Sequence, residues 1–153
     1  MLGISACLGG IACRYDGQSN TIPELRQLVD AGQAIMICPE VLGGLPIPRR
    51  PAEIQQGDGF DVWRNQARVV DTDGEDVTEL FKQGAVKAYN EIEQLQISGL
   101  ILKERSPSCG SSLIYDGSFS GNRIEGVGVA TAYFIQQGLK VYSEENWREM
   151  RIT

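Results

Sequence analysis

The segment Leu2-Gly3-Ile4-Ser5-Ala6-Cys7-Leu8-Gly9-Gly10 runs from apolar residues through a cysteine into two glycines. The same plan returns at Ile35-Met36-Ile37-Cys38-Pro39-Glu40, and at Leu100-Ile101-Leu102, which Cys109 follows after a longer tail. Short apolar runs bounded by Gly or Pro are typical of buried parallel strands. The loops that follow such strands gather at one edge of an open sheet, where ligands bind. We therefore expect three thiols that are distant in sequence to meet at one point.

Helical patterns separate these strands. Thr21 and Glu24 form a capping box for a helix that Gly32 ends, and longer patterns predict helices from Thr78 to about Gln96 and from Gly126 to Gln137. The remaining expected elements are strands at Leu113–Tyr115 and Lys140–Tyr142, a hairpin of Phe60–Trp63 with Ala67–Val70, and a short helix at Glu144–Met150. The alternation predicts an α/β fold, a three-layer sandwich with a mainly parallel, Rossmann-like sheet plus a small β-hairpin, as one domain over 1–153.

Composition limits the classes of function. The chain has 153 residues, a net charge of −6 and no histidine. No apolar run approaches the roughly 20 residues of a membrane span, and no basic stretch precedes the first apolar residues, so we expect a cytoplasmic protein. The acidic balance favours a small substrate over nucleic acid, although a local basic spot is possible at Arg49, Arg50, Lys103 and Arg105.

The four cysteines, Cys7, Cys13, Cys38 and Cys109, favour metal binding or reactivity over disulfides in a reducing compartment. The alternative is that they are small buried hydrophobic residues. Their spacing matches neither a zinc ribbon nor a ferredoxin run. A site assembled from three separate loops is a different arrangement, in which the fold and not the sequence spacing brings the ligands together. Three thiolates on a tetrahedral metal or a four-iron cube would leave one position open, as in catalytic metal sites.

Polar residues beside the cysteines are candidates for catalysis. Glu40 follows Cys38 at the same strand end, where its carboxylate can move a proton. Ser106 and Ser108 flank a proline just before Cys109, and their hydroxyls can hydrogen-bond a substrate. The competing interpretations are a solvated or helix-capping carboxylate for Glu40 and ordinary turn chemistry for the two serines.

Taken together, the motifs resemble one known family, the thiouracil desulfidases. The resemblance covers nearly the whole chain in the same order and rests on Ser5-Ala6-Cys7-Leu8-Gly9, Cys13-Arg14-Tyr15-Asp16-Gly17, Cys38-Pro39-Glu40-Val41-Leu42-Gly43-Gly44-Leu45-Pro46, Ser106-Pro107-Ser108-Cys109-Gly110 and Tyr115-Asp116-Gly117-Ser118-Phe119-Ser120-Gly121. Each motif alone is a weak signal, and their combination is a strong one.

The resemblance implies a [4Fe–4S] cluster bound by Cys7, Cys38 and Cys109, with the fourth iron open to the sulfur of a thiolated pyrimidine base or nucleoside. Replacement of C=S by C=O with water, a hydrolytic or lyase-type removal of sulfide, would need no net electron transfer. Glu40 would activate the water or protonate the ring, and Ser106 or Ser108 would hold the base. The resembled family also includes longer proteins with an added domain, linked to the removal of sulfur from thiouridine in tRNA, and we expect this chain to lack that domain.

Three alternatives stay open from sequence. Cys13 is a spare thiol, a substrate contact, or the ligand in place of Cys7. The whole chain is alternatively a zinc-binding or sulfur-carrier module without turnover of a small molecule. A cysteine hydrolase is a third interpretation, in which Glu40 or Lys103 would have to replace the missing histidine as base.

Overall fold

The computed structural model describes residues 1–150 and is built on a four-stranded parallel sheet. Its strands are β1 (Leu2–Ser5), β2 (Ala34–Ile37), β5 (Gly99–Leu102) and β8 (Val141–Ser143), in the order β2-β1-β5-β8. Ile4 is paired with Met36 on one side and with Ile101 on the other. The register therefore brings the carboxyl ends of β1, β2 and β5 to nearly the same level, as the sequence predicts.

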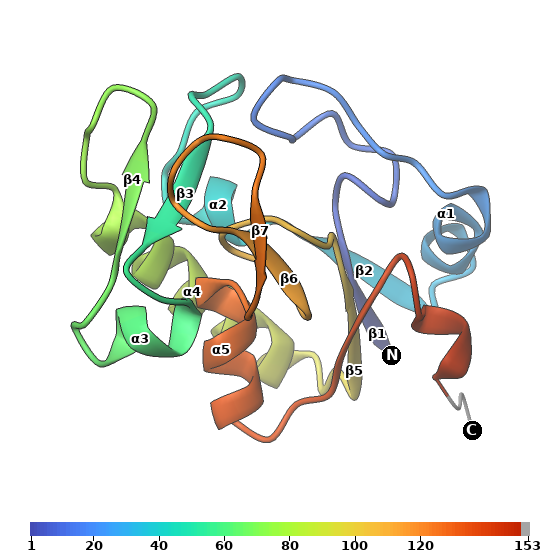
Figure 1. Cartoon of the computed structure of the whole chain (residues 1–153). Coiled ribbons are helices and arrows are strands. Elements are labelled where there is room, and N and C mark those ends of the chain that lie inside the picture. Colours follow the sequence, from blue (N-terminus) through green and yellow to red (C-terminus); the bar gives the residue numbers. More distant parts are fainter. Residues whose placement is uncertain (151–153) are drawn as a thin grey trace.

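Helices cover both faces of this sheet, which confirms the predicted α/β class. Figure 1 shows α1 (Pro23–Asp30) and the C-terminal 3-10 turn η1 (Trp147–Glu149) on one side, with α3 (Gly59–Trp63), α4 (Thr78–Gln94) and α5 (Val129–Gln136) on the other. One apolar cluster joins β1 to α1 and η1, and a second joins β5 to α4 and α5. No helix within residues 1–150 is both long and apolar enough to cross a membrane.

Two small antiparallel pairs flank the main sheet. Strand β3 (Ala52–Gln55) pairs with β4 (Arg68–Asp71), and β6 (Leu113–Tyr115) pairs with β7 (Arg123–Glu125). The stretch from Pro39 begins with the short helix α2 (Pro39–Leu42) before it becomes a loop. In Figure 1 the long connections lie together above the carboxyl edge of the sheet.

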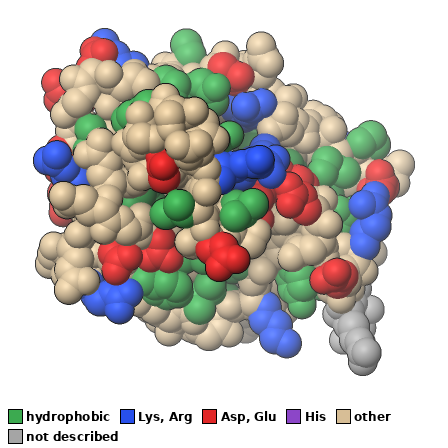
Figure 2. Space-filling model, in the orientation of Figure 1, with side chains coloured by type: hydrophobic (Ala, Val, Ile, Leu, Met, Phe, Trp, Pro, Cys, Tyr) green, Lys and Arg blue, Asp and Glu red, His purple; other side chains and the backbone are tan. Residues whose placement is uncertain are grey.

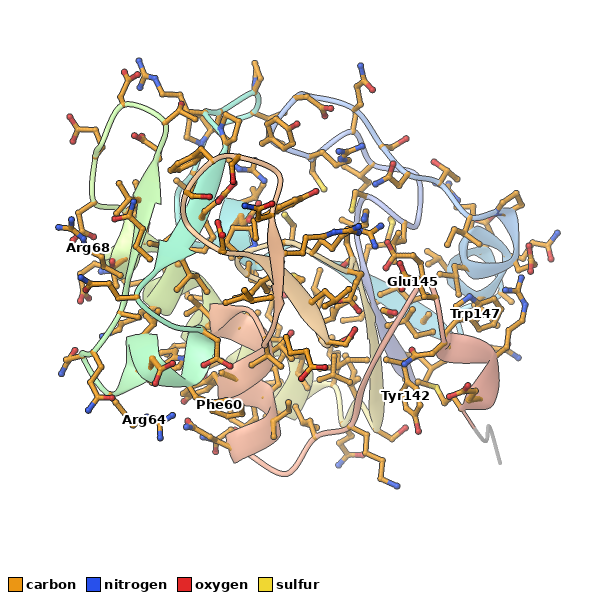
Figure 3. The ribbon with its side chains drawn as sticks, in the orientation of Figure 1. Phe60, Arg64, Arg68, Tyr142, Glu145 and Trp147 are labelled. Atoms are coloured by element: carbon orange, nitrogen blue, oxygen red, sulfur yellow. The ribbon has the colours of Figure 1, made fainter. Side chains whose placement is uncertain are left out.

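Two local predictions are wrong. The expected hairpin of Phe60–Trp63 with Ala67–Val70 is instead helix α3, followed by a strand that pairs with β3. Figure 3 shows Phe60 on that helix, Arg64 directly after its end and Arg68 on β4. Asp58 caps α3 through a capping box with Asp61, which stabilises a helix where the apolar pattern indicates a strand.

The expected capping box of α1 is also absent. The N-cap residue is Ile22, and Pro23 takes the first helical position, where its lack of an N–H costs nothing. The Thr21 hydroxyl is hydrogen-bonded to that of Ser19 at 3.1 Å instead of to the helix.

Helix α2, which carries Glu40, crosses α4 at a pair of glycines. A Cβ on Gly84 would lie 1.9 Å from the Pro39 carbonyl oxygen, and one on Gly43 would lie 2.1 Å from the Leu80 carbonyl oxygen. Only glycine permits this contact between the two backbones, so the crossing fixes the position of Glu40 relative to the core.

We predict that Gly84→Ala destabilises the protein by about 1–3 kcal/mol, because the methyl group would collide with backbone and not with a flexible side chain. Helix propensity alone predicts the opposite sign, a gain of up to about 1 kcal/mol. Urea unfolding followed by circular dichroism distinguishes the two. Gln83→Ala, at an exposed position of the same helix, is the control; an equal or higher stability of Gly84→Ala would contradict the close crossing.

Candidate cysteine-lined site

All four cysteines line one cavity of about 940 Å³ at the carboxyl edge of the sheet. Cys7 follows β1, Cys38 follows β2 directly, and Cys109 lies on the loop after β5. The parallel register therefore brings these three side chains to the same cavity. Cys13, on the connection from β1 to α1, lines it as well, and all four are free thiols.

Cys13 bridges two of the other thiols. Its side chain accepts a hydrogen bond from Cys38, which lowers the pKa of Cys13, but its own bond to Cys7 and its burial raise that pKa to about 11 overall. Donation to Cys13 and burial raise the pKa of Cys38. Without a bound cation, Cys13 and Cys38 are therefore protonated at neutral pH.

The loop that carries Cys109 is held by the start of α5. The N–H groups of Val129 and Ala130 donate to the carbonyl oxygens of Pro107 (2.8 Å) and Ser108 (2.9 Å), and the Thr131 hydroxyl donates to that of Cys109 at 2.9 Å. The first N–H groups of a helix have no partner inside it, so this loop satisfies them and is fixed in return.

Two buried hydroxyls adjoin the Cys109 thiol. Burial, and then the negative charge of Glu40, raise the pKa of Cys109, while the hydroxyls of Ser5 and Ser108 act in the opposite direction. Ser5 Oγ also accepts from the Lys103 N–H at 2.9 Å, which ties β1 to the end of β5. Ser108 Oγ is buried, has no hydrogen-bond partner among residues 1–150, and does not line the cavity.

Glu40 lies in the cavity wall and is oriented by two side chains. Arg49 Nη2 donates to Glu40 Oε2, and both side chains of this ion pair are largely buried. Ser106 Oγ donates to Glu40 Oε1 at 3.4 Å while it accepts the N–H groups of Ser108 (3.0 Å) and Cys109 (3.1 Å). Since those N–H groups occupy the serine oxygen, its proton is directed toward the carboxylate.

Arg49 does more than balance a charge. Its guanidinium also donates to the carbonyl oxygens of Cys13 and Pro46, both at 3.1 Å, and so links the cysteine loop to the proline-rich loop. The sequence placed Arg49 only in a basic spot. In the structure, each of these four basic side chains forms an ion pair with a carboxylate. The pairs are Arg49–Glu40, Arg50–Asp73, Lys103–Glu144 and Arg105–Glu145.

Charges of both signs are therefore mixed around the site. On the face drawn in Figure 2, basic and acidic side chains lie next to one another and form no continuous basic surface. Figure 3 shows Glu145, the partner of Arg105, on the connection that leads from β8 to η1. Within the described part of the chain, no three Cys, Asp or Glu side chains gather closely enough to bind a single metal ion.

Comparison with known proteins shows the family of this chain. The family model described as 2-thiouracil desulfurase matches residues 2–146. The chain belongs to the 2-thiouracil desulfurase family. The chain is also 48% identical over 150 residues to the uncharacterized protein YbbK of Bacillus subtilis (strain 168), and the match covers 98% of this chain and 99% of that one.

A solved structure has the same fold as this chain. It is that of the [4Fe-4S]-dependent thiouracil desulfidase TudS, with 43% sequence identity and a TM-score of 0.86 over 97% of this chain and 93% of that one. The family and the likeness in fold confirm the resemblance that the cysteine motifs indicate.

A buried carboxylate that sequence reasoning missed supports the Cys109 loop. Glu104 is 2% exposed, and its carboxylate accepts the N–H groups of Ser111, Ser112 and Leu113 at 2.8–3.1 Å as well as two serine hydroxyls. Burial opposes ionisation, but these donors outweigh it and lower the pKa of Glu104 to about 2. The Ser111-Ser112 pair after a strand-end glutamate is the only sequence signal for this arrangement.

We predict that Glu104→Gln lowers the free energy of unfolding by about 2–4 kcal/mol, because an amide cannot accept all of these donors. A depressed pKa means that the carboxylate's contribution is fully present above about pH 4.5 and is lost as the pH falls toward 2. Wild-type stability should therefore fall more steeply than that of the variant over this range. Chemical unfolding at several pH values measures this, with the exposed Glu125→Gln as control; equal slopes would contradict the assignment.

Proposed function

We propose that this protein is a [4Fe–4S]-dependent thiouracil desulfidase. It would replace the C=S group of a thiolated pyrimidine base or nucleoside by C=O, with water as oxygen donor and sulfide as the second product. The observation that carries the proposal is the meeting of four thiols and Glu40 in one cavity of a chain that belongs to the 2-thiouracil desulfurase family.

The residues fit such a cluster chemically. Cys7, Cys38 and Cys109 follow three adjacent parallel strands and would hold it, which leaves one iron free for the substrate. Thiols with raised pKa values, crowded in a buried cavity, release their protons when a metal group supplies positive charge. Ser108 Oγ, buried and without a partner among the described residues, lies where it can donate a hydrogen bond to the Cys109 sulfur once that sulfur is a thiolate.

The bound cluster would supply a soft Lewis acid that prefers a thiocarbonyl sulfur to an oxygen and weakens the C=S bond. Glu40 would take the proton from the attacking water. Its Oε2 is occupied by Arg49, but Oε1 accepts only the long bond from Ser106 within residues 1–150, and Glu40 lines the cavity, so this oxygen would be the one to accept a hydrogen bond from a water molecule. Ser106 orients the carboxylate and can contact the same water. Ser108 is buried and does not line the cavity, so we assign it a role at the cysteine and not at the substrate.

The cavity supports a small substrate. Tyr15, Leu45, Pro46 and Tyr115 give it apolar and aromatic walls suited to a flat ring, and its volume accommodates a base or a nucleoside. The basic side chains around it are paired with carboxylates, which favours a small substrate over a nucleic acid backbone. A reducing cytoplasm would keep the four thiols available for the cluster.

The first test is the ligand set. After anaerobic reconstitution, the wild type and Cys13→Ser should hold about four irons and four sulfides per chain and be brown, whereas Cys7→Ser, Cys38→Ser and Cys109→Ser should each lose most of the iron and all activity. Iron and sulfide analysis with visible spectroscopy checks this. Full cluster content in Cys109→Ser would refute the assignment, and a colourless wild type with zinc would favour a zinc or sulfur-carrier module.

The second test separates Glu40 from the cluster. Glu40→Gln keeps the shape of the side chain but removes the base, so the iron content should be unchanged while sulfide release from 2-thiouracil and 4-thiouracil falls about 10²–10⁴-fold. Glu75→Gln, at an exposed position of the cavity rim, is the matched control and should keep the wild-type rate. An unchanged rate in Glu40→Gln would remove Glu40 from the mechanism.

A further inference from the structure

Cys13 is a buried thiol for which the proposed function has no use. Three cysteines suffice for a cluster with an open iron, yet Cys13 is 4% exposed and lines the same cavity. Its side chain is hydrogen-bonded to those of both Cys38 and Cys7. A thiol placed this close to cluster-binding cysteines is within reach of forming a covalent bond when the cavity contains no iron.

The surroundings of Cys13 hold it against Cys38 in particular. Cys38 is fixed between β2 and α2, and it packs against the apolar cluster that contains Cys13. Arg49 reaches from the proline-rich loop to the carbonyl oxygen of Cys13 and to Glu40, two residues beyond Cys38. One guanidinium therefore fastens the two segments that carry these thiols.

The two thiols also differ in accessibility. Cys7, Cys13 and Cys109 are buried, whereas Cys38 is partly exposed at the cavity. A small oxidant that enters an empty cavity therefore meets Cys38 first. Oxidation of a thiol stops at the reversible sulfenic acid only if a neighbouring thiol reacts with it; otherwise a second oxidation gives the sulfinic acid, which is irreversible in most proteins.

We propose that Cys13 is a reserve thiol that forms a reversible disulfide with Cys38 when the cluster is absent. Hydrogen peroxide oxidises Cys38 to a sulfenic acid and is itself reduced to water. The reaction proceeds through the small thiolate fraction of Cys38, because a protonated thiol does not attack peroxide, and it is therefore slow at neutral pH. The Cys13 sulfur then attacks the Cys38 sulfur, the S–OH bond breaks, and a second water leaves with the Cys13 proton. Two thiols are oxidised and one peroxide is reduced. A dithiol reductant restores both thiols, so that Cys38 can again bind iron.

This inference rests on the proposed function only in treating Cys38 as a cluster ligand. Its test uses the full chain without iron and without substrate, so that it can fail while the desulfidase proposal stands, and the reverse. The metal-free protein is treated with hydrogen peroxide, the remaining thiols are alkylated under denaturing conditions, and tryptic peptides are mapped without reduction. We expect free thiols to fall from four to two per chain.

The peptide map identifies the pair. Cleavage after Arg14, Arg26 and Arg49 gives fragment 1–14, which contains Cys7 and Cys13, and fragment 27–49, which contains Cys38. The two fragments should be cross-linked in the wild type and in Cys7→Ser but not in Cys13→Ser. A link that persists in Cys13→Ser, a bond confined to fragment 1–14, or four free thiols would each overturn the proposal.

A second measurement shows what the disulfide protects. After peroxide, reduction and anaerobic reconstitution, the wild type should regain its iron and sulfide. Peroxide-treated Cys13→Ser should instead contain Cys38 sulfinic acid by mass spectrometry and take up little iron, although the untreated variant binds the cluster normally. Equal recovery of iron in both proteins would contradict a protective role.

Discussion

The register of three adjacent parallel strands is the constraint on which the site depends. Because β1 lies between β2 and β5 and is in register with both, the residues that follow the three strands leave the sheet at the same edge. Each of those exits carries a cysteine. A shift of one strand by one residue would turn its side chains to the other face of the sheet and separate the thiols. The register that packs the sheet is therefore also what brings the cysteines to one cavity.

The elements around the sheet restrain the segments that leave its carboxyl edge. The start of α5 binds the carbonyl groups of the Cys109 loop, and Glu104 gathers the N–H groups of the segment behind it. The glycine crossing of α2 and α4 fixes the helix that presents Glu40, while Arg49 and Ser106 set the direction of its carboxylate. These hydrogen bonds and backbone contacts together orient the site.

The sheet and its cysteines were predictable from sequence because short apolar runs that end at Gly or Pro leave few alternatives. The helix at Phe60 was not, since its apolar residues alternate as in a strand; the Asp58 and Asp61 capping box was the local signal for it. The bond from Arg49 to Cys13 could not be predicted, because only the fold brings together these residues, which are 36 positions apart. Glu104 binds N–H groups only 7 to 9 positions further along the chain, but a pair of serines does not by itself predict a turn that closes on a carboxylate. The close contact of Cys13 with Cys38 likewise depends on how a loop without regular structure folds over the cavity.

The most direct test of the proposed cluster site is a crystal structure of the anaerobically reconstituted protein with an anomalous difference map at the iron absorption edge. We predict one compact group of iron sites beneath the carboxyl ends of β1, β2 and β5, bonded to the sulfur atoms of Cys7, Cys38 and Cys109, with Cys13 unbonded and one iron facing Glu40. Iron located elsewhere, or a single metal ion bound by Cys13 together with the other thiols, would contradict it.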